Sequence, residues 1–217
     1  MKSMQKLGAI GGLTAAATFV VGIVMFATML TEYTNATDPR QAVSFLIDNQ
    51  ISLYVWNIII MIVFGIVLVP FVLALRDRLQ SGALERVATV FGLIWSGAVM
   101  ATGMIANISY GTVVDLAGTD PEAATTVWIT LDAVQRGLGG GNEILGGVWV
   151  LLVGIAGLRT GILPRWLNHL AIVMGIAGLA TVIPPLKAVG AIFGLGLIVW
   201  FVGVAVSMRR EPVSVSA

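Results

Sequence analysis

The residues best suited to chemistry lie in one short stretch, QRGLGGGNEILGG, at positions 135–147. Glu143 is an acid at the start of a long apolar run, Asn142 precedes it, and Asp132 and Arg136 lie just upstream. An ionisable group inside a membrane helix costs roughly 2.5–3.5 kcal/mol at the helix centre and less near its ends, so it normally faces a partner or a wet cavity. The stretch therefore predicts a polar cluster that binds a ligand through these four residues.

The three consecutive glycines at 139–141 leave two geometries open. If the helix that starts at Pro121 continues through them, Asp132, Arg136 and Glu143 fall within about 40° of one another on a helical wheel, at roughly 100° per residue. One helix face then carries an acid–arginine–acid line. If the glycines break the helix, the new helix directs its free N–H groups toward Glu143 or toward a bound anion.

The polar cluster has three interpretations. In the first, Glu143 is a first-turn acid that is stabilised by the helix dipole and paired with Arg136. In the second, the cluster is a solute site or a gate at the outer mouth of a helix bundle, and in the third Glu143 is a catalytic carboxylate. Asn57 is expected at a similar depth and is the fifth candidate ligand-binding residue. Asn107 lies near the outer end of its helix, and either amide is able to hydrogen-bond Glu143 or Arg136.

Other reactive side chains are scarce. The chain has no cysteine and one histidine, His169, which makes cysteine-ligated clusters, bis-histidine haem and multi-histidine zinc sites implausible. We therefore expect no metal site and no cofactor, assign no catalytic residue, and regard an enzyme as the least favoured class. The net charge of +1 gives no reason to expect a nucleic-acid partner.

Charge-free runs define the elements that position these residues. The chain is 58% hydrophobic and 11% charged, whereas soluble domains are roughly 25% charged. Five runs enclose 21 to 28 uncharged residues, and a sixth, between Glu143 and Arg159, encloses 15; about 20 residues are needed to cross a bilayer. We predict an all-α integral membrane protein with one domain, 1–217, of six transmembrane helices in a compact bundle. Their expected positions are about 7–30, 51–75, 87–108, 141–158, 166–183 and 188–208.

The basic residues predict the orientation. Six crossings leave both termini on one side, and that side carries nine of the 12 lysines and arginines. The opposite side carries three, Arg40, Arg136 and Lys187. Because loops rich in Lys and Arg stay in the cytoplasm, we expect a multi-pass protein of the plasma (bacterial inner) membrane with both termini cytoplasmic.

Two loops share the motif Thr-Asp-Pro, at 37–39 and 119–121. In each, the aspartate suits the N-cap of a helix and the proline suits its first position. We therefore expect short outer-face helices in the loops between helices 1 and 2 and between helices 3 and 4. The shared motif leaves open whether these two helical hairpins are repeats.

The aromatic residues fall into two predicted groups. Trp95, Trp149 and Trp200 lie deep in apolar runs and are expected in the core of the bundle. The other group is expected to form an aromatic belt at the outer membrane surface; its members are Tyr33, Tyr54, Tyr110 and Trp128.

The second half of the chain resembles a known family. The resemblance covers 137–206 and is carried by Gly141-Asn142-Glu143, by Gly146, Gly147 and Trp149, by LPRWL at 163–167, and by glycines at 194 and 196. These features are similar to the bacterial six-helix membrane proteins grouped as the domain of unknown function DUF4386. The resemblance implies the fold and the membrane location, and it implies no reaction.

These patterns lead to one function and one alternative. We expect a membrane protein that binds or passes a small solute or lipid at a polar cluster on its outer face. The alternative is a non-catalytic accessory subunit that packs against another membrane protein or against a second copy of itself. In either case the lipid bilayer is an expected partner.

Overall fold

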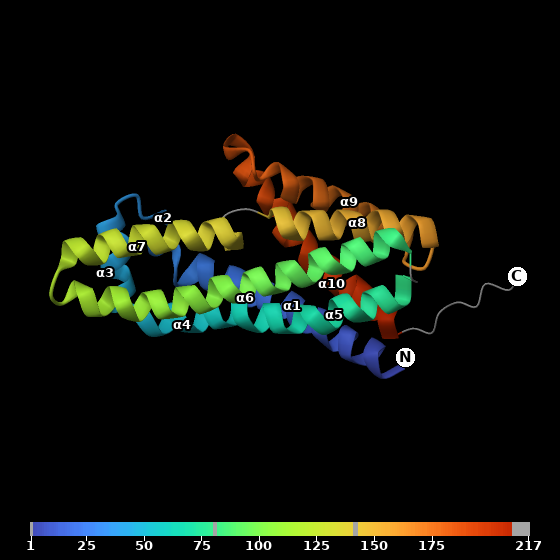
Figure 1. Ribbon diagram of the computed structural model, residues 1–217, viewed down its shortest axis with the longest axis horizontal. Helices are drawn as coiled ribbons and strands as arrows, with labels where there is room; N and C mark the ends of the chain where they lie inside the picture. The colour runs from blue at the N-terminus through green and yellow to red at the C-terminus, as the bar shows by residue number, and fades with distance from the viewer. Residues whose placement is uncertain (1, 80–81, 141–142, 210–217) are drawn as a thin grey trace, which may run out of the picture.

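The computed structural model describes residues 2–79, 82–140 and 143–209, and all regular secondary structure in these ranges is helical (Figure 1). The elements are α1 (Lys2–Thr28), α2 (Thr31–Asn35), α3 (Pro39–Asp48), α4 (Gln50–Asn57), the π-helical η1 (Ile58–Val63), α5 (Phe64–Leu79), α6 (Ala83–Ala117), α7 (Pro121–Gln135), the π-helical η2 (Arg136–Gly140), α8 (Ile144–Thr160), α9 (Arg165–Ala180), the 3-10 helix η3 (Pro184–Val189) and α10 (Gly190–Arg209).

Five helical segments are long and apolar enough to cross a membrane. They are Ser3–Thr28, Gln50–Leu79, Ala83–Ala117, Pro121–Thr160 and Pro184–Arg209. Within the fourth segment, α7 and α8 are separate helices, because Gly139 interrupts the helical backbone between them. Helix α9 has 16 residues, a length of about 24 Å. The length and composition of these helices are those of a multi-pass membrane protein.

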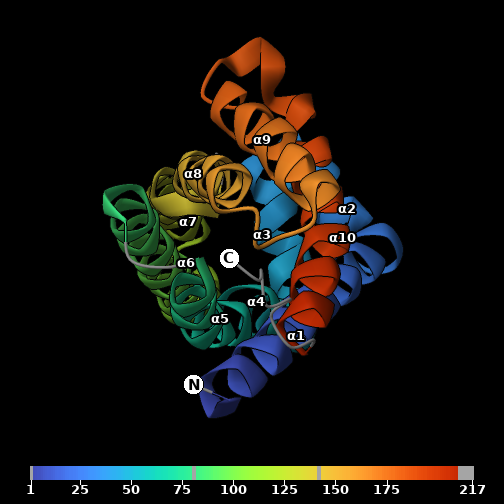
Figure 2. The same ribbon diagram turned by 90° about the vertical axis from the view of Figure 1, so that its right-hand side faces the viewer.

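Six helices form a closed ring that follows the order of the chain. Helix α1 packs against α5, α5 against α6, α6 against α8, α8 against α9, α9 against α10, and α10 returns to α1 (Figure 2). The interior of the ring is filled by aromatic rings, with Trp149 and Trp200 in edge-to-face contact at 5.5 Å. Trp95, Trp149 and Trp200 are 3%, 1% and 0% exposed, so the prediction that they pack in the core is confirmed.

A second apolar core lies beyond the ring, among α2, α3, α4, α7 and the C-terminal half of α6. It contains Leu30, Leu46, Leu53, Tyr110 and Val113. The aromatic residues that the sequence assigns to an outer belt pack in and against this core. The Tyr54 and Tyr110 rings contact each other at 5.6 Å, and Tyr33 contacts Trp128 at 6.4 Å. These rings therefore stabilise helix contacts within the protein, and their position at a membrane surface stays a prediction.

Both Thr-Asp-Pro motifs begin helices. Helix α3 starts at Pro39, and the Asp38 side chain accepts a hydrogen bond from the Arg40 N–H at 2.9 Å. Helix α7 starts at Pro121, and the Asp120 side chain accepts from the Ala123 N–H at 3.0 Å. Helices α3 and α7 pack against each other, so the two motifs bring together two helices of the second core.

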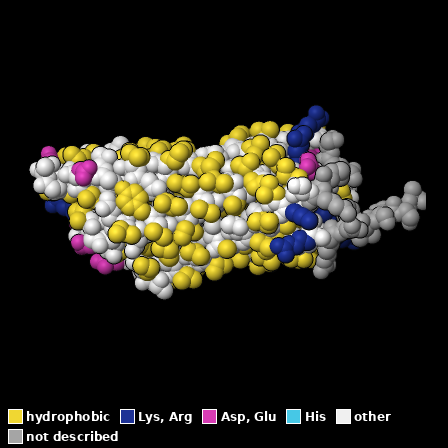
Figure 3. All heavy atoms as spheres, turned by 90° about the horizontal axis from the view of Figure 1, so that it is seen from below, with side chains coloured by type: hydrophobic (Ala, Val, Ile, Leu, Met, Phe, Trp, Pro, Cys, Tyr) yellow, Lys and Arg dark blue, Asp and Glu magenta, His cyan; other side chains and the backbone are white. Residues whose placement is uncertain are grey.

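The surface has an apolar middle and two charged ends. On the face shown in Figure 3, hydrophobic side chains cover the middle, Lys and Arg gather toward one end, and most Asp and Glu lie toward the other. The basic end is the end at which α5, α8 and α10 finish, each with an arginine in its last turn. This distribution matches a molecule whose long axis crosses a bilayer.

Candidate functional site

The glycine-rich stretch breaks the helix. Gly139 has a φ of 142°, a backbone conformation that glycine adopts readily and other residues rarely do. Of the two geometries that the sequence left open, the broken helix is the one observed. The helical wheel that lines up Asp132, Arg136 and Glu143 therefore does not apply across Gly139.

Glu143 lies at the start of α8 and is tied to the end of α9. Its backbone N–H donates a hydrogen bond to the Thr181 hydroxyl at 2.9 Å, and that hydroxyl donates to the Gly178 carbonyl at 2.6 Å. The Glu143 carbonyl accepts from the Gly147 N–H at 2.7 Å, which forms the first turn of α8. The backbone of Glu143 is thus fixed, while its side chain is free of any role as a helix cap.

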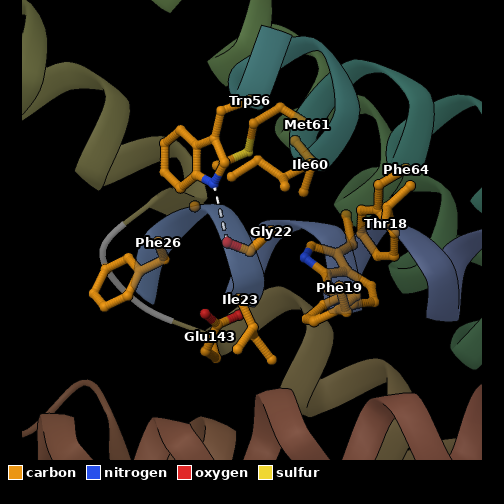
Figure 4. A pocket seen from close by; sticks show the side chains of 13 residues that line it. Thr18, Phe19, Gly22, Ile23, Phe26, Trp56, Ile60, Met61, Phe64 and Glu143 are labelled. Atoms are coloured by element: carbon orange, nitrogen blue, oxygen red, sulfur yellow. Dashed lines mark hydrogen bonds between the residues drawn. The ribbon is translucent and has the colours of Figure 1, made fainter. Parts of the chain in front are cut away.

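The Glu143 side chain lines a pocket of about 260 Å³ (Figure 4). The pocket lies between the two apolar cores. Phe64, Trp95 and Val99 belong to the core of the ring, whereas Trp56 packs against the second core. The remaining wall comes from α1, from η1 and from the glycine break; its members are Thr18, Phe19, Gly22, Ile23, Phe26, Ile60, Met61 and Gly139.

Most polar atoms of the wall already have partners. The Trp56 Nε1–H donates to the Gly22 carbonyl at 3.3 Å, shown as the dashed line in Figure 4. The Thr18 hydroxyl donates to the Ala15 carbonyl at 2.7 Å. Glu143 is the one charged residue among the described residues that line the pocket. The site therefore combines a single carboxyl group with walls that are mainly aromatic and aliphatic.

Two irregular helical segments border the pocket. Ile60 and Met61 belong to the π-helix η1, and Gly139 lies at the break between α7 and α8, where its φ of 142° is not helical. π-Helical turns are rare and occur frequently at functional sites, since they widen a helix and shift side chains out of the regular register. One side of the pocket is thus formed by a π-helical turn and another by a helix break.

Arg136 and Asp132 form an ion pair away from the pocket wall. The Arg136 Nε lies 2.6 Å from the Asp132 Oδ2, and the two side chains are 62% and 29% exposed. A pair of this exposure contributes at most about 1 kcal/mol to stability. Neither residue is among those that line the pocket. Asn142, the fourth member of the predicted cluster, lies outside the described residues.

Asn57 joins α4 to α6 by hydrogen bonds. Its Nδ2 donates to the Gly103 carbonyl and to the Asn107 Oδ1, each at 2.8 Å, and its side chain is 2% exposed. Hydrogen bonds of this kind join membrane helices. The structure thus brings Asn57 together with Asn107 on α6, and neither residue lines the Glu143 pocket.

Sequence analysis missed the aromatic wall from α1. Phe19 and Phe26 precede Glu143 by more than 100 positions, and α1 is apolar on all its faces. No periodicity therefore indicates which side of α1 turns toward the ring. The available signal was Gly22, where the backbone approaches Ile60 closely enough that a side chain would collide with it.

The fold and the pocket together define a class: a helical protein with membrane-spanning composition and an acidic, aromatic-walled pocket between two cores. Comparison of the chain with protein-family models, with curated proteins and with solved structures gave no match. In the part of the chain that the structure describes, no three metal-binding side chains of the His, Cys, Asp or Glu type come together.

Proposed function

We propose that this chain is a six-helix protein of the plasma membrane that binds a small solute or lipid in the Glu143 pocket. The observation that carries the proposal is the position of one carboxyl group in a largely apolar pocket at the junction of two cores. Ligand sites are typically concave and mostly apolar, with a few polar groups that orient the ligand. Membership of the DUF4386 family, implied by the resemblance of the second half of the chain, is part of the same proposal.

The six proposed crossings are the members of the ring: α1, the continuous α4–η1–α5 segment, α6, α8, α9 and α10. Helix α9 is the shortest of them, with a length of about 24 Å, and it packs against α8 on one side and α10 on the other. Nine of the 12 Lys and Arg residues fall at one end on this arrangement, which supports a cytoplasmic position for both termini.

The proposed orientation gives a depth for the pocket. Glu143 precedes Arg159 by 16 residues on one helix, a rise of about 24 Å. If Arg159 marks the cytoplasmic boundary of a hydrocarbon layer about 30 Å thick, Glu143 lies about 6 Å inside the outer boundary. A ligand is then able to reach the pocket from the outer leaflet.

Binding is favoured over chemistry by the wall of the pocket. Besides Glu143, the polar side chains in the wall are Thr18 and Trp56, and both donate hydrogen bonds to backbone carbonyls. A lone carboxyl group is well suited to hold a ligand, whereas acid–base or nucleophilic catalysis uses a second reactive group within hydrogen-bond distance.

Access of reagents to single cysteines tests the proposal, because the native chain has no cysteine to interfere. Ile23→Cys and Glu143→Cys report on the pocket, and Val150→Cys, at a position that is 0% exposed in the ring core, is the matched control. The proteins are labelled in vesicles with a membrane-impermeant thiol reagent and with a membrane-permeant maleimide.

We expect at least one of the two reagents to label the pocket cysteines, and both to spare Val150→Cys. Equal protection of all three positions would overturn the binding proposal. That outcome would favour the alternative, an accessory subunit whose interior is sealed and whose outer surface packs against another membrane protein or a second copy.

A further inference from the structure

We infer that the ligand of the Glu143 pocket is a small hydrophobic organic cation, whose amine or ammonium group lies against Glu143 and whose apolar body lies against the aromatic wall. This inference rests on the proposed binding function and adds the chemical class of the ligand. Three features carry it: the charge of the site, the aromatic wall, and the opening of the pocket along α1.

The charge of the site favours a cationic ligand. The described lining contains one carboxylate and no Lys, Arg or His. The nearest basic residue in the sequence, Arg136, forms its ion pair with Asp132. An ionised carboxylate that is removed from water without a counter-ion is strongly disfavoured, and a cationic ligand supplies that counter-ion. An anionic ligand would be repelled, and a neutral one would supply no counter-charge to an ionised Glu143.

The aromatic wall suits an organic cation better than a metal ion. Phe19, Phe26, Trp56, Phe64 and Trp95 line the pocket, and a cation within about 6 Å of an aromatic face is attracted by the ring quadrupole. Ca²⁺ and Mg²⁺ instead require about six or more oxygen ligands. The described wall offers one carboxylate, a threonine hydroxyl and backbone carbonyls, which is too few.

Four of the five rings in the aromatic wall are held in place by contacts within the protein. Phe64 meets Phe19 edge to face at 5.2 Å and meets Trp95 in the same manner at 5.3 Å. The indole of Trp56 is anchored by its hydrogen bond to the Gly22 carbonyl. Rings that are fixed before binding lose little conformational freedom when a ligand arrives, so their attraction for a cation is retained as affinity.

The pocket opens along α1. Ile23 and Phe26 line it, yet their side chains are 41% and 48% exposed. In the proposed orientation these side chains face the hydrocarbon, so a ligand with an apolar body reaches the site sideways from the bilayer. The volume of about 260 Å³ is below the roughly 300–1,000 Å³ of pockets for drug-sized molecules. A small cation with a single ring or a short alkyl body therefore fits best.

A matched pair of probes tests the charge requirement. Benzyltrimethylammonium is the cation, and neopentylbenzene has the same shape with a carbon atom in place of the nitrogen. Binding of radiolabelled probes to the full-length protein in detergent micelles is measured by equilibrium dialysis against protein-free micelles. The quantity compared is the ratio of affinities between wild type and variant, because partition of each probe into the micelle cancels in that ratio.

The variants are Glu143→Gln and, as the matched control, Glu122→Gln, the same change at an exposed acid in the first turn of α7. We expect Glu143→Gln to weaken binding of benzyltrimethylammonium at least tenfold and to leave binding of neopentylbenzene within twofold. Glu122→Gln should change neither. Phe26→Leu provides a second variant at an exposed wall position, and it should weaken the cation several-fold while sparing the neutral probe.

The outcomes separate this inference from the proposed function. If both probes respond equally to Glu143→Gln, or if the cation does not bind to wild type, the inference of a cationic ligand is overturned. The proposal that the pocket binds a ligand is then tested by the cysteine labelling alone. If Glu143→Gln does not fold, a selective loss of cation affinity in Phe26→Leu supports the inference, and an equal loss for both probes overturns it.

Discussion

The Glu143 backbone and the Thr181 side chain are joined by a hydrogen bond of 2.9 Å across 38 positions of sequence. Thr181 is 4% exposed. Its hydroxyl also donates a hydrogen bond to the Gly178 carbonyl, so the side chain links the start of α8 to the end of α9. Thr181 itself is not among the residues that line the pocket. Its part is to fix the backbone from which that carboxyl group extends.

Thr181→Val should therefore destabilise the protein and weaken the site. The substitution keeps the shape of the side chain but removes both hydrogen bonds, and an unsatisfied buried N–H costs about 1–3 kcal/mol. Thermal unfolding in detergent should show this loss, and benzyltrimethylammonium should bind more weakly. Thr181→Ser, which keeps the hydroxyl, is the control and should restore most of both. Equal effects of the two substitutions would show that the hydrogen bonds are not the cause.

Gly175→Ala should destabilise the contact between α8 and α9. A Cβ at Gly175 would lie 2.6 Å from the Leu151 Cβ and 2.8 Å from the Leu151 Cα and backbone nitrogen, where nothing flexible is able to move aside. Overpacking of this kind costs about 1–3 kcal/mol. Gly97→Ala is the control, since a Cβ there meets nothing within 4 Å. A midpoint of thermal unfolding that is lower for Gly175→Ala and unchanged or higher for Gly97→Ala is the expected result.

Asn57 and Asn107 should show a measurable coupling. The Asn57 Nδ2 donates to the Asn107 Oδ1 at 2.8 Å between α4 and α6. Hydrogen bonds between membrane helices contribute about 0.6 kcal/mol on average and up to about 1.7 kcal/mol. A double-mutant cycle of Asn57→Ala and Asn107→Ala, measured by unfolding in detergent, should give a coupling energy in this range. Strictly additive effects would contradict the contact.

Asp132→Asn should have little effect. Its ion pair with Arg136 is exposed, and we expect a change of less than about 1 kcal/mol in the free energy of unfolding. Because Asp132 does not line the pocket, the affinity for benzyltrimethylammonium should remain within twofold of wild type. A loss as large as that expected for Glu143→Gln would show that the two acids act as one site after all.

Tyr33 should make the second core sensitive to alkaline pH. Burial raises the pKa of the Tyr33 hydroxyl above its ordinary value of 10.0, and the nearby Asp132 carboxylate acts in the same direction. The unfolded chain loses this proton at lower pH than the folded protein does, so stability falls as pH rises above about 10. Tyr33→Phe removes this contribution. The variant should lose less stability than wild type between about pH 9 and about pH 11, and an identical loss would contradict the assignment.

Several parts of the structure follow from the sequence for clear physical reasons. Charged residues are excluded from the hydrocarbon layer, so the charge-free runs predict long apolar helices. The burial of Trp95, Trp149 and Trp200 follows from their distance from the charged ends. The break at Gly139 follows from a run of residues with little preference for the helix, although the sequence alone left a continuous helix open.

The site itself depends on relationships that local patterns do not contain. Arg136 had two carboxylates within reach in the sequence, and in the structure it pairs with Asp132, four positions earlier. Asn57 pairs with Asn107 because α4 and α6 pack together with these two side chains facing each other. The pocket exists because α1, η1 and α6 meet around Glu143. Helices that are apolar on all sides carry no periodic signal for their rotation, so these neighbours were not predictable.

The closed ring also has a consequence for biogenesis. Helix α1 is made and inserted early, yet one of its two ring neighbours is α10, which leaves the ribosome after all the other members of the ring. Chains are synthesised from the N-terminus, so the flank of α1 that packs on α10 is exposed to lipid for most of translation. There, a side chain at Gly12 would collide with Phe71 and lie close to Ala205. Until α10 is made, this flank of α1 lacks the neighbour that covers it in the folded ring.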